Sequence, residues 1–160
     1  MPRTPDDQRI SLSGDGRFPA LRLQDFADLA GSYSVSGPLV AIIDDDEELC
    51  WSLVDLMRSD GYRAEPYTSA ETFLTSSNLF SSDCIVADVD MPGMSGLNLL
   101  RKLHEQGIAT PVILITALPH RHLNDEATSL GAQCLLGKPF ETTALLDWVD
   151  RSLSNEPPAR

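Results

Sequence analysis

Basic residues are scarce in this chain. Its 160 residues include 12 lysines and arginines against 24 aspartates and glutamates, and the formal net charge is −12. A domain that binds duplex nucleic acid directly needs positive charge, because contacts to phosphates supply most of its affinity. The charge balance therefore argues against direct nucleic-acid binding. It suits a soluble protein that binds other proteins, or a divalent cation where several acids meet in one pocket.

Long apolar runs are lacking too. No stretch approaches the roughly 18 to 20 consecutive apolar residues of a membrane-spanning helix. The first residues, MPRTPDDQRISLSGDG, lack the apolar core of a secretory signal. These absences predict a cytoplasmic protein with no membrane association. The three cysteines, Cys50, Cys84 and Cys134, form no C-x-x-C or Cys/His cluster, so we expect reduced thiols that act as small apolar side chains.

From Leu39 onward, short apolar runs alternate with stretches of helical spacing. The apolar runs are LVAII (39–43), YRAEPY (62–67), CIVADV (84–89), VILIT (112–116) and CLL (134–136). The first, third and fourth are continuously apolar, which is typical of strands covered on both faces. Leucine spacing and capping residues predict helices over 47–59, 69–76, 95–106, 119–130 and 141–153. This alternation predicts an α/β domain with a doubly wound, five-stranded parallel sheet.

The two ends of the chain differ from this domain. Residues 1–37 are rich in Ser, Gly, Pro and Asp, and we interpret them as a largely disordered N-terminal extension before a domain over residues 38–153. The alternative is a docking helix over residues 23–30, and the sequence does not decide between the two. Residues 154–160 are a short polar tail.

Polar side chains follow four of the five expected strands. Asp44 and Asp45 come after the first strand, Asp88 and Thr116 end the third and fourth, and Lys138 comes after the fifth. Ligands of an open parallel sheet sit outside the carboxyl ends of its strands, so these side chains should meet at one edge. Taken singly, each has a plain structural explanation, such as an acidic helix start for the first pair.

The combination of these side chains is more informative than any one of them. Three carboxylates in one pocket repel each other and should resist full ionisation, and a hard divalent cation such as Mg²⁺ removes that penalty. Beside such a metal, Asp88 offers a nucleophile, Thr116 a hydroxyl donor and Lys138 a fixed ammonium. This set matches the needs of phosphoryl transfer to a carboxylate.

In their order and spacing, these motifs resemble the receiver domain of bacterial two-component response regulators. The matching stretches are IIDDDEE, VADVDMPGMSG, LIT followed by Ala, and GKPF, and the resemblance covers roughly residues 38–153. The pattern DxxMPxMxG followed by ITA and KPF is similar to the receivers of nitrogen-fixation-type transcriptional regulators. The resemblance implies the (βα)5 flavodoxin-like receiver fold. It also implies a protein that is not an enzyme beyond Mg²⁺-dependent phosphoryl acceptance and self-dephosphorylation.

The resemblance implies a role for each acidic position. Asp88 would accept a phosphoryl group from a sensor histidine kinase or a histidine phosphotransferase. Asp45 and Asp88 would bind Mg²⁺ through their side chains, and Asp44 would assist through water. Asp90 would contribute its backbone carbonyl to the metal. Its position influences in this family how fast the phosphoryl group is lost, and the sequence does not give the direction.

The resemblance also implies a switch surface that binds a downstream protein target. Lys138 would bridge to the phosphoryl group, and Thr116 would move to hydrogen-bond it. In the family this movement is coupled to repacking of a surface that here covers about residues 118–150. The position three before Lys138 is usually an aromatic, but here it is Leu135, which cannot reproduce a rotating ring. Leu118, two residues past Thr116, is expected to shield the site partly from water.

Three interpretations of the function stay open. The first is a stand-alone receiver that acts as a binding switch or a phosphate relay, since too few residues follow Leu153 for a helix-turn-helix output module. The second is an enzyme, because Asp88-Val-Asp90 also resembles the nucleophile motif of haloacid-dehalogenase-type phosphatases. Those enzymes need acidic ligands downstream, whereas the acidic pair here lies upstream. The third is a receiver-shaped binding module that no longer uses phosphate.

Overall fold

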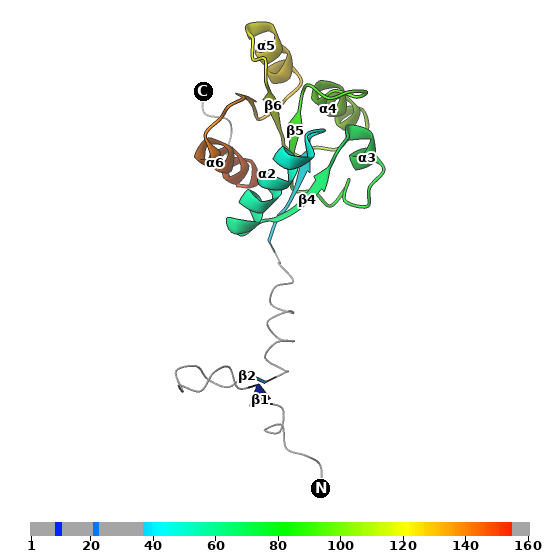
Figure 1. Cartoon of the computed structure of the whole chain (residues 1–160). Coiled ribbons are helices and arrows are strands. Elements are labelled where there is room, and N and C mark those ends of the chain that lie inside the picture. Colours follow the sequence, from blue (N-terminus) through cyan, green and yellow to red (C-terminus); the bar gives the residue numbers. More distant parts are fainter. Residues whose placement is uncertain (1–8, 11–20, 23–36, 155–160) are drawn as a thin grey trace. The chain divides into compact units, whose positions relative to one another are not determined.

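The computed structural model describes residues 9–10, 21–22 and 37–154 (Figure 1). The chain divides into two compact units, residues 1–36 and residues 37–160.

The first unit contributes one pair of short strands. β1 (Arg9–Ile10) runs antiparallel to β2 (Leu21–Arg22). The predictions of a largely disordered extension over residues 1–37, or of a docking helix over residues 23–30, fall almost wholly outside the described residues. The predicted polar tail also lies outside them, apart from Ser154.

The second unit is built on a parallel sheet of five strands in the order β4-β3-β5-β6-β7. These strands are β3 (Leu39–Ile43), β4 (Arg63–Tyr67), β5 (Cys84–Asp88), β6 (Val112–Thr116) and β7 (Cys134–Gly137). The helices that follow them in turn are α2 (Glu47–Ser59), α3 (Ala70–Leu74), α4 (Gly96–Glu105), α5 (Arg121–Ser129) and α6 (Thr142–Leu153). The predicted doubly wound α/β fold is confirmed.

Helices cover both faces of this sheet, because successive side chains of a strand point to opposite faces. In β3, Val40 and Ile42 pack in a cluster with α2 and α6, whereas Ala41 and Ile43 pack in a cluster with α3, α4 and α5. In Figure 1, α2 and α6 accordingly lie on one side of the sheet and α3 and α4 on the other. The strands β3, β5 and β6 are buried along their whole length, as their continuous apolar runs predict.

The helix starts follow local capping chemistry. The Ser69 hydroxyl accepts a hydrogen bond from the Thr72 amide at 3.1 Å, so Ser69 caps α3 as predicted. The helix expected from residue 119 begins instead at Arg121, because the imidazole of His120 is its cap. There, Nδ1 of His120 accepts a hydrogen bond from the Leu123 amide at 3.1 Å.

The three thiols match the expectation from the sequence. All three cysteines are free. Burial raises the pKa of Cys84 to about 12 and that of Cys134 to about 12, which leaves both as inert thiols. Within residues 9–10, 21–22 and 37–154, no helix is long and apolar enough to cross a membrane.

Candidate functional site

An acidic cluster lies at the carboxyl edge of the parallel sheet. It consists of Asp44, Asp45 and Asp88, whose carboxylate oxygens lie within 4.8 Å of one another. Asp44 and Asp88 are only 2% and 4% exposed, whereas Asp45 is exposed to solvent. The neighbouring strands β3 and β5 hold the two buried acids side by side, because each acid comes at or just after the end of its strand. The sequence predicted this convergence.

Short-range hydrogen bonds orient the two buried carboxylates. Asp44 Oδ1 accepts from the Asp46 amide at 2.9 Å, and Asp88 Oδ1 accepts from the Asp90 amide at 3.0 Å. Asp46 itself caps α2 by accepting from the Leu49 amide at 3.2 Å. The aspartates that follow β3 therefore act in two different ways. Asp46 starts the helix, and Asp44 is turned toward the sheet edge.

Lys138 places its ammonium between the two buried carboxylates. Its Nζ lies 3.2 Å from Asp88 Oδ2 and 3.4 Å from Asp44 Oδ2. The Lys138 amide donates to the Thr116 carbonyl at 2.8 Å, which fixes the backbone of Lys138 at the end of β6. The following Lys138–Pro139 peptide bond is cis. The structure thus joins groups at the carboxyl ends of β3, β5 and β7 in one ion-paired cluster.

The positive charge of Lys138 does not fully offset the burial and mutual repulsion of the Asp44 and Asp88 carboxylates. Burial raises the pKa of Asp44, and the charge of Asp88 raises it further, against the opposing effects of the Asp46 amide and Lys138. For Lys138, burial lowers the pKa, but the charges of Asp44 and Asp88 outweigh it, and the net pKa is raised. Ionised Asp44 is therefore held at a cost, whereas protonated Lys138 is favoured.

We expect Asp44→Asn to be more stable than the parent at neutral pH without divalent cations. Because the pKa of Asp44 is raised above 3.8 in the folded state, the folded protein binds that proton more tightly than the unfolded chain. Its contribution to stability therefore falls as the pH rises from the unfolded value through the folded one. The neutral amide removes this cost and keeps an acceptor for the Asp46 amide. We expect a gain of about 0.5–2 kcal/mol in the free energy of unfolding.

Urea unfolding in a chelator checks this, with Asp55→Asn as the control. Asp55 is exposed on α2, so its variant should stay within about 0.5 kcal/mol of the parent. The gain of Asp44→Asn should also shrink as the pH is lowered toward 4, roughly the ordinary carboxyl pKa. A variant less stable than the parent at neutral pH would show that the sign of the pKa shift is wrong.

Thr116 also lies at this edge, but its hydroxyl faces Asp90. Thr116 Oγ1 donates to Asp90 Oδ2 at 2.8 Å, and the Ala117 amide donates to the same oxygen at 3.2 Å. From the sequence, Asp90 was expected to offer its backbone carbonyl to the metal and to influence the loss of the phosphoryl group, but its side-chain contact with Thr116 was not predicted. A weak signal exists in retrospect. Thr116 ends β6, and Asp90 lies two residues beyond the end of the paired strand β5.

The loop between β5 and α4 is anchored from α3 by a residue that the sequence did not single out. Glu71 Oε1 accepts from the Met94 amide at 2.9 Å. Gly93, next to this contact, has a φ of +77°, a conformation that side chains other than glycine rarely adopt. Glu71 thus fixes the loop that follows Asp88.

The two leucines of the predicted switch surface differ in burial. Leu118 is 72% exposed, in the loop between β6 and α5. Leu135 lies in β7, partly buried against the cluster under α3, α4 and α5. Their roles in switching stay predictions.

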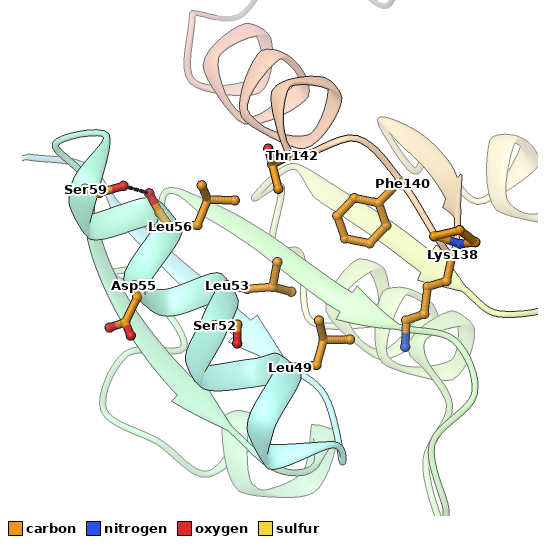
Figure 2. A pocket seen from close by; sticks show the side chains of 10 residues that line it. Leu49, Ser52, Leu53, Asp55, Leu56, Ser59, Lys138, Phe140 and Thr142 are labelled. Atoms are coloured by element: carbon orange, nitrogen blue, oxygen red, sulfur yellow. Dashed lines mark hydrogen bonds between the residues drawn. The ribbon is translucent and has the colours of Figure 1, made fainter.

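Figure 2 shows a groove that is lined in part by Lys138, the lysine of the ion-paired cluster. It has a volume of about 650 Å³ and lies between α2 and the segment that joins β7 to α6. Leu49 and Leu53 of α2 face Phe140 across it, and the side chain of Lys138 extends along one end. An apolar groove therefore adjoins the charged site directly.

The acidic cluster fits a magnesium ion. Mg²⁺ prefers oxygen ligands and keeps several of its waters in protein sites. Asp44, Asp45 and Asp88 offer only oxygen ligands, and the exposed Asp45 leaves one side of the site open to water. Burial and the charge of Asp88 raise the pKa of Asp44, so a bound cation would favour its ionised form.

A doubly wound fold with this edge of acids and a lysine is that of a response regulator receiver domain. The family model of the response regulator receiver domain matches residues 40–150, and the chain belongs to this family. It is 41% identical over 114 residues to the transcriptional regulatory protein FixJ of Azorhizobium caulinodans, covering 71% of this chain and 54% of that protein. It is 34% identical over 122 residues to the response regulator protein TodT of Pseudomonas putida, covering 76% and 54%.

Solved structures agree with this assignment. The receiver domain of the Francisella response regulator 1452 superposes with a TM-score of 0.70 at 28% identity, covering 74% of this chain and 98% of that one. The structure FixJ-N gives a TM-score of 0.67 at 31% identity, covering 74% and 95%. The predicted receiver family and its flavodoxin-like fold are confirmed. The chain spans about half the length of the curated relatives it matches.

Membership in this family settles the class of protein. Receiver domains belong to two-component regulatory systems of signal transduction, interact with histidine kinases or phosphotransfer proteins, and generally bind Mg²⁺ through acidic residues. They are generally not enzymes apart from self-dephosphorylation. The stand-alone role, the domain boundaries at 37/38 and 153/154, and the cytoplasmic location stay predictions.

Proposed function

We propose that this chain is a phosphorylation-controlled signalling protein whose Asp88 accepts a phosphoryl group from a histidine kinase or a histidine phosphotransferase. The observation that carries the proposal is the buried Asp88 carboxylate, with Oδ2 3.2 Å from the Lys138 ammonium and two further carboxylates beside it. A purely structural ion pair needs one acid. Two additional carboxylates raise the cost of the cluster unless a cation joins it, which supports a metal-assisted site.

In the proposed transfer, an Asp88 oxygen attacks the phosphorus of a phosphohistidine on the partner. The new O–P bond forms as the P–N bond to the imidazole breaks, and the imidazole leaves with the electron pair and takes up a proton. Lys138 balances negative charge beside the reacting carboxylate. A magnesium ion held by Asp45 and Asp88, with Asp44 acting through water and Asp90 through its carbonyl, would neutralise charge on the phosphoryl oxygens.

Phosphorylation of Asp88 then changes the surface that bears Leu118 and Leu135, and a downstream protein binds to that surface. Passage of the phosphoryl group to a histidine protein supports a relay, and a phosphorylation-dependent complex supports a switch. The strongly acidic chain is a poor direct ligand for nucleic acid, so we propose a protein target.

Incubation with acetyl phosphate and Mg²⁺ tests the proposal. We expect incorporation of one phosphoryl group per chain, bound as an alkali-labile acyl phosphate, and near-complete loss of labelling when a chelator removes the metal. Intact-protein mass spectrometry and release of inorganic phosphate measure both quantities. Steady turnover of a small phosphoester would support the phosphatase interpretation instead, whereas phosphate released from acetyl phosphate is also expected from a receiver that dephosphorylates itself. No labelling with Mg²⁺ present would support a binding module that does not use phosphate.

A further inference from the structure

Asp90 makes contacts that the proposed phosphoryl transfer does not use. Its Oδ2 accepts from the Thr116 hydroxyl at 2.8 Å and from the Ala117 amide at 3.2 Å. Its own amide donates to Asp88 Oδ1 at 3.0 Å. One residue therefore ties the carboxylate at the end of β5 to the hydroxyl and backbone at the end of β6.

The Thr116 hydroxyl has a single proton to give. Thr116 is 0% exposed, and an unsatisfied buried hydroxyl costs about 1–3 kcal/mol, so this proton always goes to some acceptor. Here the acceptor is a carboxylate, and charge-assisted hydrogen bonds of this kind are about twice as strong as neutral ones. The oxygen of the same hydroxyl accepts from the Leu118 amide at 3.1 Å, so its donor and one acceptor position are both in use.

A phosphoryl group on Asp88 would be a second acceptor within reach. Strands β5 and β6 are paired, with Asp88 opposite Ile115, the residue before Thr116. A phosphoryl oxygen and Asp90 Oδ2 would therefore compete for one proton. They would also repel each other, because both carry negative charge.

We propose that Asp90 is a positioning residue that holds the Thr116 hydroxyl in the unphosphorylated arrangement and thereby opposes the phosphorylated one. This inference rests on the proposed phosphoryl acceptance at Asp88. A contact made in only one of two states shifts the equilibrium toward that state by the free energy of the contact. Asp90 makes its two hydrogen bonds to the end of β6 in the unphosphorylated state and loses at least the one from Thr116 when the hydroxyl turns to phosphate.

Beryllofluoride, a phosphoryl mimic, measures this competition when it is titrated in the presence of Mg²⁺. We expect Asp90→Ala to bind beryllofluoride about tenfold more tightly than the parent. The mimic then no longer has to break the charge-assisted hydrogen bond from Thr116 to Asp90, and tenfold corresponds to roughly one such bond. Asp60→Ala at the end of α2 removes an exposed acid outside the switch surface and is the matched control, with unchanged affinity. Asp90→Asn keeps an acceptor oxygen and should give an intermediate gain.

A double-mutant cycle separates competition for the hydroxyl from simple charge repulsion. In a Thr116→Val background, Asp90→Ala should gain less than about twofold, because no hydroxyl is left to release. A gain that persists in that background would assign the effect to repulsion and overturn the proposal. The Thr116→Ser background, which restores the hydroxyl, should restore the full gain.

A second readout needs no phosphoryl mimic. In the protein without Mg²⁺, the amide NMR resonance of Ala117 should move in Asp90→Ala and move less in Asp90→Asn. An unmoved Ala117 resonance in Asp90→Ala would show that the contact is absent in solution, and the proposal would fail.

If the parent itself binds no beryllofluoride, both the proposed phosphoryl acceptance at Asp88 and the proposed competition for the Thr116 hydroxyl are wrong. If the parent binds it and Asp90→Ala binds no more tightly, only the competition fails.

Discussion

Replacing Asp88 with asparagine should abolish phosphorylation while leaving the fold intact. The amide lacks the anionic oxygen that attacks phosphorus, so labelling by acetyl phosphate should fall below detection. The amide oxygen of Asp88→Asn has the same size and can still accept from the Asp90 amide, which the parent carboxylate does at 3.0 Å. Lys138 keeps Asp44 as a partner at 3.4 Å. Intact-protein mass spectrometry after incubation with the phosphodonor measures the loss.

The matched control for this substitution is Asp60→Asn, an exposed acid at the end of α2. It should be labelled to the level of the parent. Circular dichroism and urea unfolding of Asp88→Asn should show a native fold, so that loss of labelling is not loss of structure. Labelling of Asp88→Asn at the level of the parent would move the phosphoacceptor to another acid and remove the basis of the proposed function.

The sheet and its reacting edge could be predicted because both follow from topology. The continuous apolar runs of β3, β5 and β6 indicate burial on both faces, and parallel strands bring their carboxyl ends to one edge. Asp44, Asp88 and Lys138 were therefore expected at one edge. Lys138 follows β7, two strands from β5, so its contact with Asp88 also depends on the length of the lysine side chain.

The contacts that orient the site could not be predicted in this way. The hydrogen bond from Thr116 to Asp90 depends on the path of the loop after β5 and on the rotamers of both side chains. The anchoring of that loop by Glu71 joins residues from different elements, with no spacing rule to connect them. His120 as the cap of α5 was missed for a related reason, because histidine is not among the preferred capping residues.

Three predicted strands, β4, β5 and β7, differ from the structure by one residue at one end. The run expected over residues 62–67 begins one residue later in the structure, at Arg63, whose amide bonds the Pro38 carbonyl at 3.0 Å as the first rung of the β4–β3 pairing. Tyr62 instead donates its amide to the Met57 carbonyl at 3.1 Å and so belongs to the end of α2. Apolar character alone does not show whether an aromatic residue between a helix and a strand closes the helix or begins the strand.

Gly96 is the position where the backbone around Asp88 is most tightly packed. A Cβ added there would lie 2.6 Å from the Asp88 carbonyl oxygen and 3.1 Å from Leu114 Cδ2. The first of these is a backbone atom of Asp88, the proposed phosphoacceptor, so it can yield only if the end of β5 moves. Glycine is needed here for close approach, in contrast to Gly93, where a φ of +77° is the reason.

We therefore expect Gly96→Ala to lower the free energy of unfolding by about 1–3 kcal/mol, the usual cost of overpacking a filled site. The better helix propensity of alanine, worth up to about 1 kcal/mol in a helix interior, acts in the opposite direction and is smaller at this first helical residue. Asn98→Ala on the same helix is exposed and should change stability by less than about 0.5 kcal/mol. Because the displaced atom belongs to Asp88, the folded fraction of Gly96→Ala should also be phosphorylated more slowly than the parent. Urea unfolding and labelling rates under native conditions check both effects, and a variant as stable as Asn98→Ala would show that β5 and α4 can separate without cost.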